Sequence, residues 1–285
     1  MVEIKPPAME LFYNALAPTT LVKPAPVKGV WLPSSPPNIT SELEKAKVIL
    51  HFPGGAFVIA FGHETSGRPA TEILTKYLQA NRVLWAQYRL ASNNQTCFPA
   101  ALQDALTYYH HLLSLGINSK NIVLSGDSAG GNIVLALMRY PESAQASELP
   151  LPGSAIVFSP WVHVTSHAAK DYEACSNIKA DILSGSLLQW GAASYLPSEQ
   201  LSRETEAYIS PLHHPFRTSA GEAESFFEHI KSFSAGMKEM NGDRVRFHAA
   251  PKAPHDFLLY YDAFGMKDEL VTAVDKACEF FDERK

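Results

Sequence analysis

A serine with very small neighbours stands where an apolar run changes into a helical pattern. The stretch reads "VLSGDSAGGNIVLAL", so Ser128 has Gly126 two residues before it and Gly130 two residues after it. In this G-x-S-x-G pattern the glycines remove steric clashes, and a tight strand-to-helix turn can raise the serine hydroxyl above a sheet. The free N–H groups at the start of the helix would favour an oxyanion there. The pattern predicts a nucleophilic serine, with an N-cap serine in a glycine-rich turn as the alternative.

A nucleophilic serine needs a general base, and the base needs an acid that orients it. Of eleven histidines, His255 lies in the stretch "APHDFLLYY", in an expected loop after the last expected strand and far downstream of Ser128. This placement agrees with the chain order serine, acid, histidine. Packing or surface positions are expected for five other histidines, which lie in helical patterns or before a proline: His110, His111, His213, His214 and His229.

Small residues also follow the first strong apolar run, in "HFPGGAF" at residues 51–57. Gly54, Gly55 and Ala56 have little or no side chain, so their backbone amides could approach a substrate oxygen. Together with the amide of Ala129 they would form an oxyanion hole, in which each donor contributes about 3 kcal/mol in the transition state. A plain Pro-Gly-Gly turn is the alternative interpretation.

The elements that must position these residues are strands and helices in alternation. Buried strands are expected at residues 46–52, 82–88, 121–125, 154–159 and 245–249. Amphipathic helices are expected at residues 99–116, 224–242 and 267–285. Such alternation predicts a mostly parallel sheet that is covered by helices on both faces.

The 285 residues are sufficient for one domain with a large core, 1–285. Residues 1–45, which are rich in proline, and residues 162–210 do not follow the alternation, and both are expected to contribute to a cap. The net charge of −5 and the lack of a basic run argue against a nucleic-acid partner.

Composition also bears on the cellular setting. The start of the chain does not have the pattern of a signal peptide, and no apolar run is as long as a membrane span. Three widely spaced cysteines are not typical of a disulfide or metal framework. The sequence therefore predicts a cytoplasmic, reducing environment.

Four motifs occur in one order along the chain: "HFPGGAF", "YRLASNNQTCFPAALQDA", "GDSAGGN" and "PHDF". Together they resemble the hormone-sensitive-lipase-like branch of the α/β-hydrolases, in particular its fungal esterase-type members encoded beside natural-product pathways. The resemblance implies an α/β-hydrolase fold with a small cap. It also implies a serine hydrolase of carboxylic esters or lactones that uses no metal or cofactor.

The resemblance also implies roles for individual residues. Ser128 matches the nucleophile, Ala129 the oxyanion amide that follows it, and His255 the base. Gly54, Gly55 and Ala56 match the three glycines of the family's His-Gly-Gly-Gly motif. Pro53 stands at the position of the motif's histidine, so the role of that histidine is either lost or moved to His51.

The orienting acid is expected in the segment "GEAESFFEH", where the resemblance places Glu224 at the acid position. The other candidates are Glu222, Glu228 and Asp243, and an acid at a helix start is also a good partner for the helix dipole. The family carries an apolar strand before this acid, but here only residues 219–220 occupy its place. The seventh strand is therefore expected to be truncated or missing.

Three functions fit these expectations. The first is hydrolysis of a small-molecule ester or lactone through an acyl-enzyme on Ser128. The second is release or cyclisation of a polyketide-like intermediate in the same cleft. The third is a ligand-binding scaffold without turnover, which the shortened acid segment favours and the presence of both Ser128 and His255 disfavours. Oligomeric state is not constrained.

Overall fold

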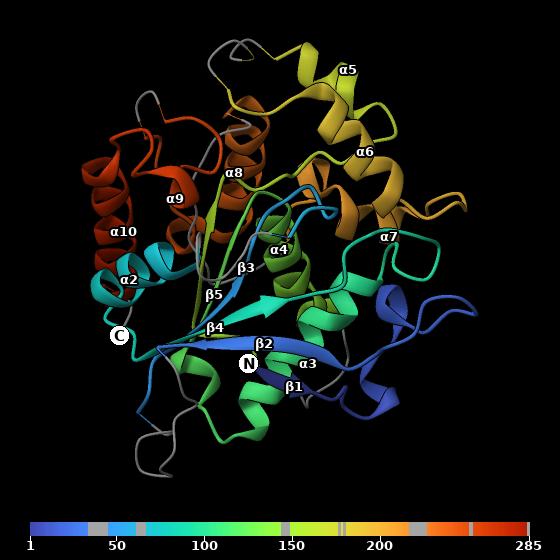
Figure 1. The fold of residues 1–285 in the computed structure, drawn as a ribbon, viewed down its shortest axis with the longest axis horizontal. Coiled ribbons are helices and arrows are strands. Elements are labelled where there is room, and N and C mark those ends of the chain that lie inside the picture. Colours follow the sequence, from blue (N-terminus) through green and yellow to red (C-terminus); the bar gives the residue numbers. More distant parts are fainter. Residues whose placement is uncertain are drawn as a thin grey trace.

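The structure is a computed structural model that describes residues 1–33, 45–60, 67–143, 149–175, 178, 181–216, 227–250 and 253–283. Within these residues, six strands form one sheet in the order β1-β2-β4-β3-β5-β6 (Figure 1). Their bounds are β1 Val2–Ile4, β2 Val27–Leu32, β3 Val48–Phe52, β4 Arg82–Gln87, β5 Ile122–Asp127 and β6 Ser154–Phe158. The strands from β4 to β6 are parallel, while β1 and β2 pair antiparallel at one edge. The predicted mostly parallel sheet is confirmed.

Helices cover both faces of the sheet. On β3, Val48 and Leu50 belong to one hydrophobic cluster and Ile49 to a second, because successive side chains of a strand point to opposite faces. The first cluster includes side chains of α3 (Ala100–Ser114) and α4 (Ser128–Ser143). The second includes side chains of α2 (Arg68–Tyr77) and α10 (Lys267–Asp282).

Five further α-helices occur among the described residues. They are α5 (Ala168–Glu173), α6 (Gly185–Tyr195), α7 (Arg203–Ile209), α8 (Phe227–Asn241) and α9 (Phe257–Tyr260). Figure 1 shows α5 and α6 grouped together at one end of the molecule. Among the described helices, none combines the length and the apolar character that a membrane crossing needs.

The expected strand at residues 245–249 does not form. This stretch has no regular secondary structure; Val245 and Phe247 pack in the first hydrophobic cluster, and Arg246 turns to the end of α10. Arg246 Nη2 lies 2.7 Å from Glu283 Oε2, and the Arg246 guanidinium lies 4.8 Å from the ring centre of Phe280. A strand needs a hydrogen-bonded neighbour, and β6 is the last strand of the described sheet on this side. The truncated strand expected before Glu224 falls in residues 217–226, outside the described residues.

The N-terminal stretch also differs from expectation. Residues 1–45 are expected in the cap, but their described part supplies β1 and β2 of the sheet itself. The alternation in β2 is weak because four consecutive residues of that strand, Val30 among them, are buried. A short strand that is buried on both faces has no period of two to detect, so the sequence pattern missed it.

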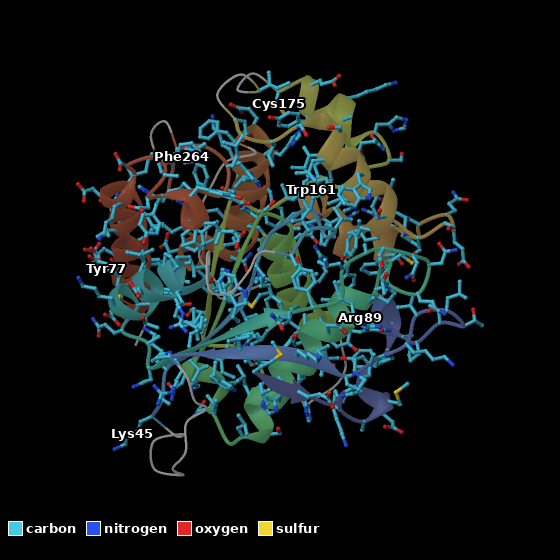
Figure 2. All side chains as sticks on the ribbon, viewed as in Figure 1. Lys45, Tyr77, Arg89, Trp161, Cys175 and Phe264 are labelled. Atoms are coloured by element: carbon cyan, nitrogen blue, oxygen red, sulfur yellow. The ribbon has the colours of Figure 1, made fainter. Side chains whose placement is uncertain are left out.

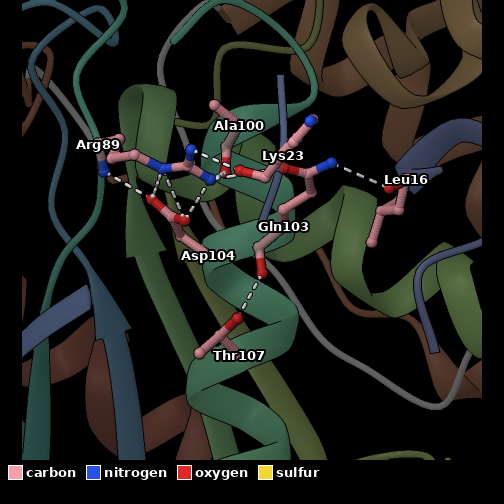
Figure 3. Close-up of polar contacts among 7 residues, drawn as sticks. All are labelled: Leu16, Lys23, Arg89, Ala100, Gln103, Asp104 and Thr107. Carbon is pink, nitrogen blue, oxygen red and sulfur yellow. Dashed lines mark hydrogen bonds and ion pairs between the residues drawn. The ribbon is translucent and has the colours of Figure 1, made fainter. Parts of the chain in front are cut away.

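An ion pair with a partly exposed arginine and a fully buried aspartate joins the segment after β4 to α3 (Figure 3). Arg89 Nη2 lies 2.7 Å from Asp104 Oδ1, and the Arg89 backbone N–H donates to Asp104 Oδ2 at 2.8 Å. The same guanidinium donates to the carbonyl oxygens of Lys23 and Ala100. Asp104 is completely buried. Through these contacts Arg89 connects its own segment after β4 with the segment of Lys23 and with α3.

We expect Asp104→Ala to lower the free energy of unfolding by about 3 kcal/mol, because it leaves the Arg89 charge without its buried partner. The matched control is Glu283→Ala, which removes a carboxylate at the same 2.7 Å distance from an arginine, but from a pair in which both side chains are largely exposed. The control should lower stability by no more than about 1 kcal/mol. Urea denaturation of both variants measures the difference, and equal losses would contradict the prediction.

Candidate active site

Ser128 lies at the junction of β5 and α4 in a strained turn. Its φ angle is 50°, in the left-handed region that a serine rarely adopts. A Cβ atom on Gly130 would lie 1.9 Å from the Phe52 carbonyl oxygen, and one on Gly126 would lie 2.5 Å from the Gly130 oxygen. Both glycines are therefore required by close backbone contacts, as the G-x-S-x-G motif predicts.

The structure brings Ser128 and His255 together. Nε2 of His255 lies 2.7 Å from Oγ of Ser128, although 127 residues separate them in the chain. Ser128 is 3% exposed and His255 is 1% exposed, so the pair is covered by other residues. Burial lowers the pKa of His255 to about 3, because the imidazolium loses its hydration there. At neutral pH the imidazole is uncharged and can accept the serine proton.

The loop after β3 presents backbone amides near this pair, but not all those expected. The Gly54 N–H donates to Asp127 Oδ2 at 2.7 Å, so it is not available to a substrate, and its expected oxyanion role is corrected. Gly55, with φ 117°, and Ala56, with φ 51°, turn the chain immediately afterwards. Within the described part of the chain, no acceptor is bonded to the amides of Gly55, Ala56 or Ala129.

His51, the residue to which the role of the motif's histidine is expected to move if it is not lost, has a buried polar setting. His51 is fully buried, and its ring stacks on Trp85 with 4.4 Å between ring centres. Its Nδ1 lies 3.0 Å from Ser125 Oγ, and its Nε2 lies 3.1 Å from Asp127 Oδ1 without completing a well-aligned hydrogen bond. The His51 ring therefore lies against the Asp127 carboxylate, which accepts the hydrogen bond from the Gly54 amide.

Two of the four candidates for the orienting acid lie within the described residues. Glu224 and Glu222 fall in residues 217–226, outside the described residues, so the assignment of Glu224 stays a prediction. Glu228 lies in the first turn of α8 and Asp243 follows that helix, and both are exposed, whereas the His255 imidazole is buried.

A carboxyl group that was not predicted, that of Asp256, lies at the reacting end of His255, with a second, that of Asp127, beside it. Asp256 Oδ1 is 3.5 Å from His255 Nε2, and the Asp256 side chain hydrogen-bonds with that of Asp127. Burial raises the pKa of Asp256 well above that of an ordinary aspartic acid, and the nearby charges of Asp127 and Asp181 raise it further. Asp127 and Asp256 stand inside the motifs "GDSAGGN" and "PHDF", and their adjacency to Ser128 and His255 was the available signal.

A third carboxyl group, from the segment before α6, holds the backbone of the histidine loop. The carboxylate of Asp181 accepts hydrogen bonds from the backbone N–H groups of Ile182, Leu183 and His255. Burial raises the pKa of Asp181, and these three hydrogen bonds lower it in part. The segment before α6 is thus tied to the main chain of His255.

Helix α6 covers the loop that carries the free amides. A Cβ atom on Gly191 would lie 2.3 Å from the Ala56 carbonyl oxygen, so helix and loop are in close backbone contact. The rings of Phe57 and Tyr195 stack with centres 3.7 Å apart. Trp161, labelled in Figure 2, is 2% exposed and packs on Phe57, and its backbone N–H donates to the Ser128 carbonyl.

A serine on a strained strand-to-helix turn, bonded to a histidine from a late loop over a mostly parallel sheet, is the arrangement of an α/β-hydrolase. The sequence model of a family described as "alpha/beta hydrolase fold" matches residues 49–259. The chain belongs to this family.

Curated relatives and solved structures agree with this membership. The chain is 30% identical over 192 residues to "Esterase LipU" of Mycobacterium tuberculosis, covering 62% of this chain and 61% of the relative. It is also 30% identical over 198 residues to an "Esterase" of Acinetobacter venetianus, covering 68% of this chain and 59% of the relative. The match thus spans about three fifths of the length of these relatives.

Among solved structures, an esterase/lipase from an uncultured bacterium has a TM-score of 0.70 at 24% identity, covering 96% of this chain and 88% of that one. A hormone-sensitive lipase from a metagenome library has a TM-score of 0.66 at 24% identity, covering 86% of this chain and 80% of that one. At this identity the likeness shows the fold.

Proposed function

We propose that the protein is a carboxylic ester hydrolase that works through an acyl-enzyme on Ser128. The observation that carries the proposal is the 2.7 Å contact between Ser128 Oγ and the neutral imidazole of His255. In the proposed mechanism His255 accepts the serine proton while Oγ attacks the acyl carbon, and it then protonates the leaving alcohol. Water hydrolyses the acyl-enzyme by the same route in reverse.

Three backbone amides would stabilise the oxyanion of the tetrahedral intermediate. Gly55, Ala56 and Ala129 are proposed for this role, because their N–H groups have no acceptor among the described residues and Ala129 begins α4 immediately after the nucleophile. The resemblance adds Glu224 as the acid that orients His255.

The proposed substrate is an ester or lactone with a small or medium acyl group. The curated relatives are named esterases, and Ser128 is only 3% exposed. A pathway intermediate of a natural product as the substrate, and a cytoplasmic location, remain predictions from the sequence.

A covalent serine probe together with a short p-nitrophenyl ester tests the proposal. Labelling of Ser128 with ester turnover supports hydrolysis. Labelling without turnover would favour release or cyclisation of a polyketide-like intermediate. Absence of labelling would contradict a nucleophilic serine and favour a ligand-binding scaffold.

Asp181 provides a separate prediction about positioning. We expect Asp181→Ala to lower kcat/KM for the p-nitrophenyl ester about tenfold or more, because the main chain of His255 loses its acceptor and the imidazole moves from its productive position. Asp181→Asn keeps a side-chain oxygen that accepts the same N–H, so it should retain most of the activity. Similar kinetics for the alanine variant and the unmodified protein would contradict this role.

A further inference from the structure

The carboxyl group of Asp256 occupies an unusual place beside the catalytic pair. The residue is 5% exposed, and its Oδ1 has no hydrogen-bond partner among the described residues. This oxygen lies 3.5 Å from Nε2 of His255, the nitrogen that faces Ser128 Oγ. A buried polar atom without a partner is costly, so its persistence at a reacting centre calls for a ligand.

The position of Asp256 excludes the usual role of an acid in such a site. An orienting acid binds Nδ1 of the histidine, on the far side of the ring from the serine. Asp256 instead approaches Nε2, where the leaving alcohol and the attacking water must also lie. Its left-handed backbone, with φ 54°, places the side chain there.

The charge state of Asp256 is compatible with catalysis at this place. An ionised carboxylate near Nε2 would favour a proton on that nitrogen and would prevent His255 from accepting the serine proton. Burial and the neighbouring Asp127 raise the pKa of Asp256, which disfavours this ionised form. In its protonated form the carboxyl group can present Oδ1 as an uncharged acceptor.

We propose that Oδ1 of Asp256 positions the water that hydrolyses the acyl-enzyme. One hydrogen of this water points to Oδ1 and the other to Nε2 of His255. The water oxygen bonds to the acyl carbon while its proton passes to Nε2, and the bond between the acyl carbon and Ser128 Oγ then breaks as Oγ recovers that proton. Asp256 neither gains nor loses a proton in this step. The inference rests on the proposed function.

The test measures how the acyl-enzyme divides between water and added methanol, with p-nitrophenyl acetate as the acyl donor. The ratio of acetic acid to methyl acetate reports on deacylation whichever step limits turnover. Methanol has a single hydroxyl hydrogen, which it gives to Nε2, so it does not need the second acceptor. We expect Asp256→Gly to lower this ratio about tenfold, the effect of losing one hydrogen bond.

Two further variants separate positioning from structure. Asp256→Asn keeps Oδ1 and provides an N–H for Asp127, and asparagine tolerates the left-handed backbone, so its ratio should stay near that of the unmodified protein. Glycine also tolerates this backbone, which makes Asp256→Gly free of added strain. Should that variant fail to fold, Asp256→Ala removes the same oxygen and is measured instead.

The outcomes are distinct. An unchanged product ratio in the glycine or alanine variant, even with slower turnover, would assign Asp256 a structural role and overturn the inference. A ratio in the asparagine variant as low as in the glycine variant would overturn it as well. Failure of the unmodified protein to form an acyl-enzyme on Ser128 would instead refute the proposed function itself.

Discussion

Replacement of Ser128 by alanine is expected to lower the turnover of a short p-nitrophenyl ester by about three orders of magnitude or more. The hydroxyl that lies 2.7 Å from His255 Nε2 is the group proposed to form the acyl-enzyme, and no other atom of the side chain can replace it. Residual activity would come from the backbone amides that are proposed to bind the oxyanion. Initial rates and covalent labelling measure the effect together, and labelling should disappear.

Ser159 offers a matched control for this variant. It is a buried serine at the end of β6 with φ 48°, nearly the same backbone conformation as Ser128, so alanine meets the same strain at both positions. Ser159→Ala should keep most of the activity, while His255→Ala should lose activity as Ser128→Ala does. Turnover that survives in Ser128→Ala, or an equal loss in Ser159→Ala, would show that another residue carries the reaction.

The second large effect is expected from Gly130→Ala. Its methyl group would lie 1.9 Å from the carbonyl oxygen and 2.6 Å from the carbonyl carbon of Phe52, so β3 and α4 would have to separate. Overpacking in a close-packed interior lowers the free energy of unfolding by about 1–3 kcal/mol where flexible side chains can move aside. Here the obstacle is the backbone of Phe52, which cannot move aside in the same way. We therefore expect a loss of about 3 kcal/mol or more in the free energy of unfolding.

Gly236→Ala in α8 is the appropriate comparison. A Cβ atom there would have its nearest neighbours at 3.4 Å, on the side chain of Pro215, which is an ordinary contact. Because alanine favours a helix over glycine by about 1 kcal/mol, this variant should be at least as stable as the unmodified protein. Thermal melts and urea denaturation compare the two, and similar stability of both variants would mean that the turn can relax around a methyl group.

The parts of the fold that could be predicted are those encoded by local patterns. The strand expected at residues 82–88 forms as Arg82–Gln87, and the helix expected at 99–116 forms as Ala100–Ser114. The buried apolar runs and the terminal residues that define these two elements involve only residues close together in the chain. The strand expected at 245–249 does not form, because a strand needs a hydrogen-bonded neighbour and the sequence of these five residues does not indicate whether one is present.

The same distinction holds for the candidate site. Ser128 and His255 could be found because a glycine-spaced motif marks one and chain order marks the other. Gly54 was assigned wrongly because the use of its amide depends on the Asp127 carboxylate, which arrives from another strand. Asp181 was missed for a related reason, since an acid that binds a backbone N–H carries no motif.

The contact between Gly191 and Ala56 has a consequence for redesign of substrate preference. Helix α6 contacts the carbonyl oxygen of Ala56, whose amide is proposed to bind the oxyanion, so the position of this helix and the geometry of the proposed oxyanion hole depend on each other. Transplanting residues 162–210 from a relative would therefore disturb the proposed oxyanion hole, unless the incoming helix has a glycine opposite Ala56.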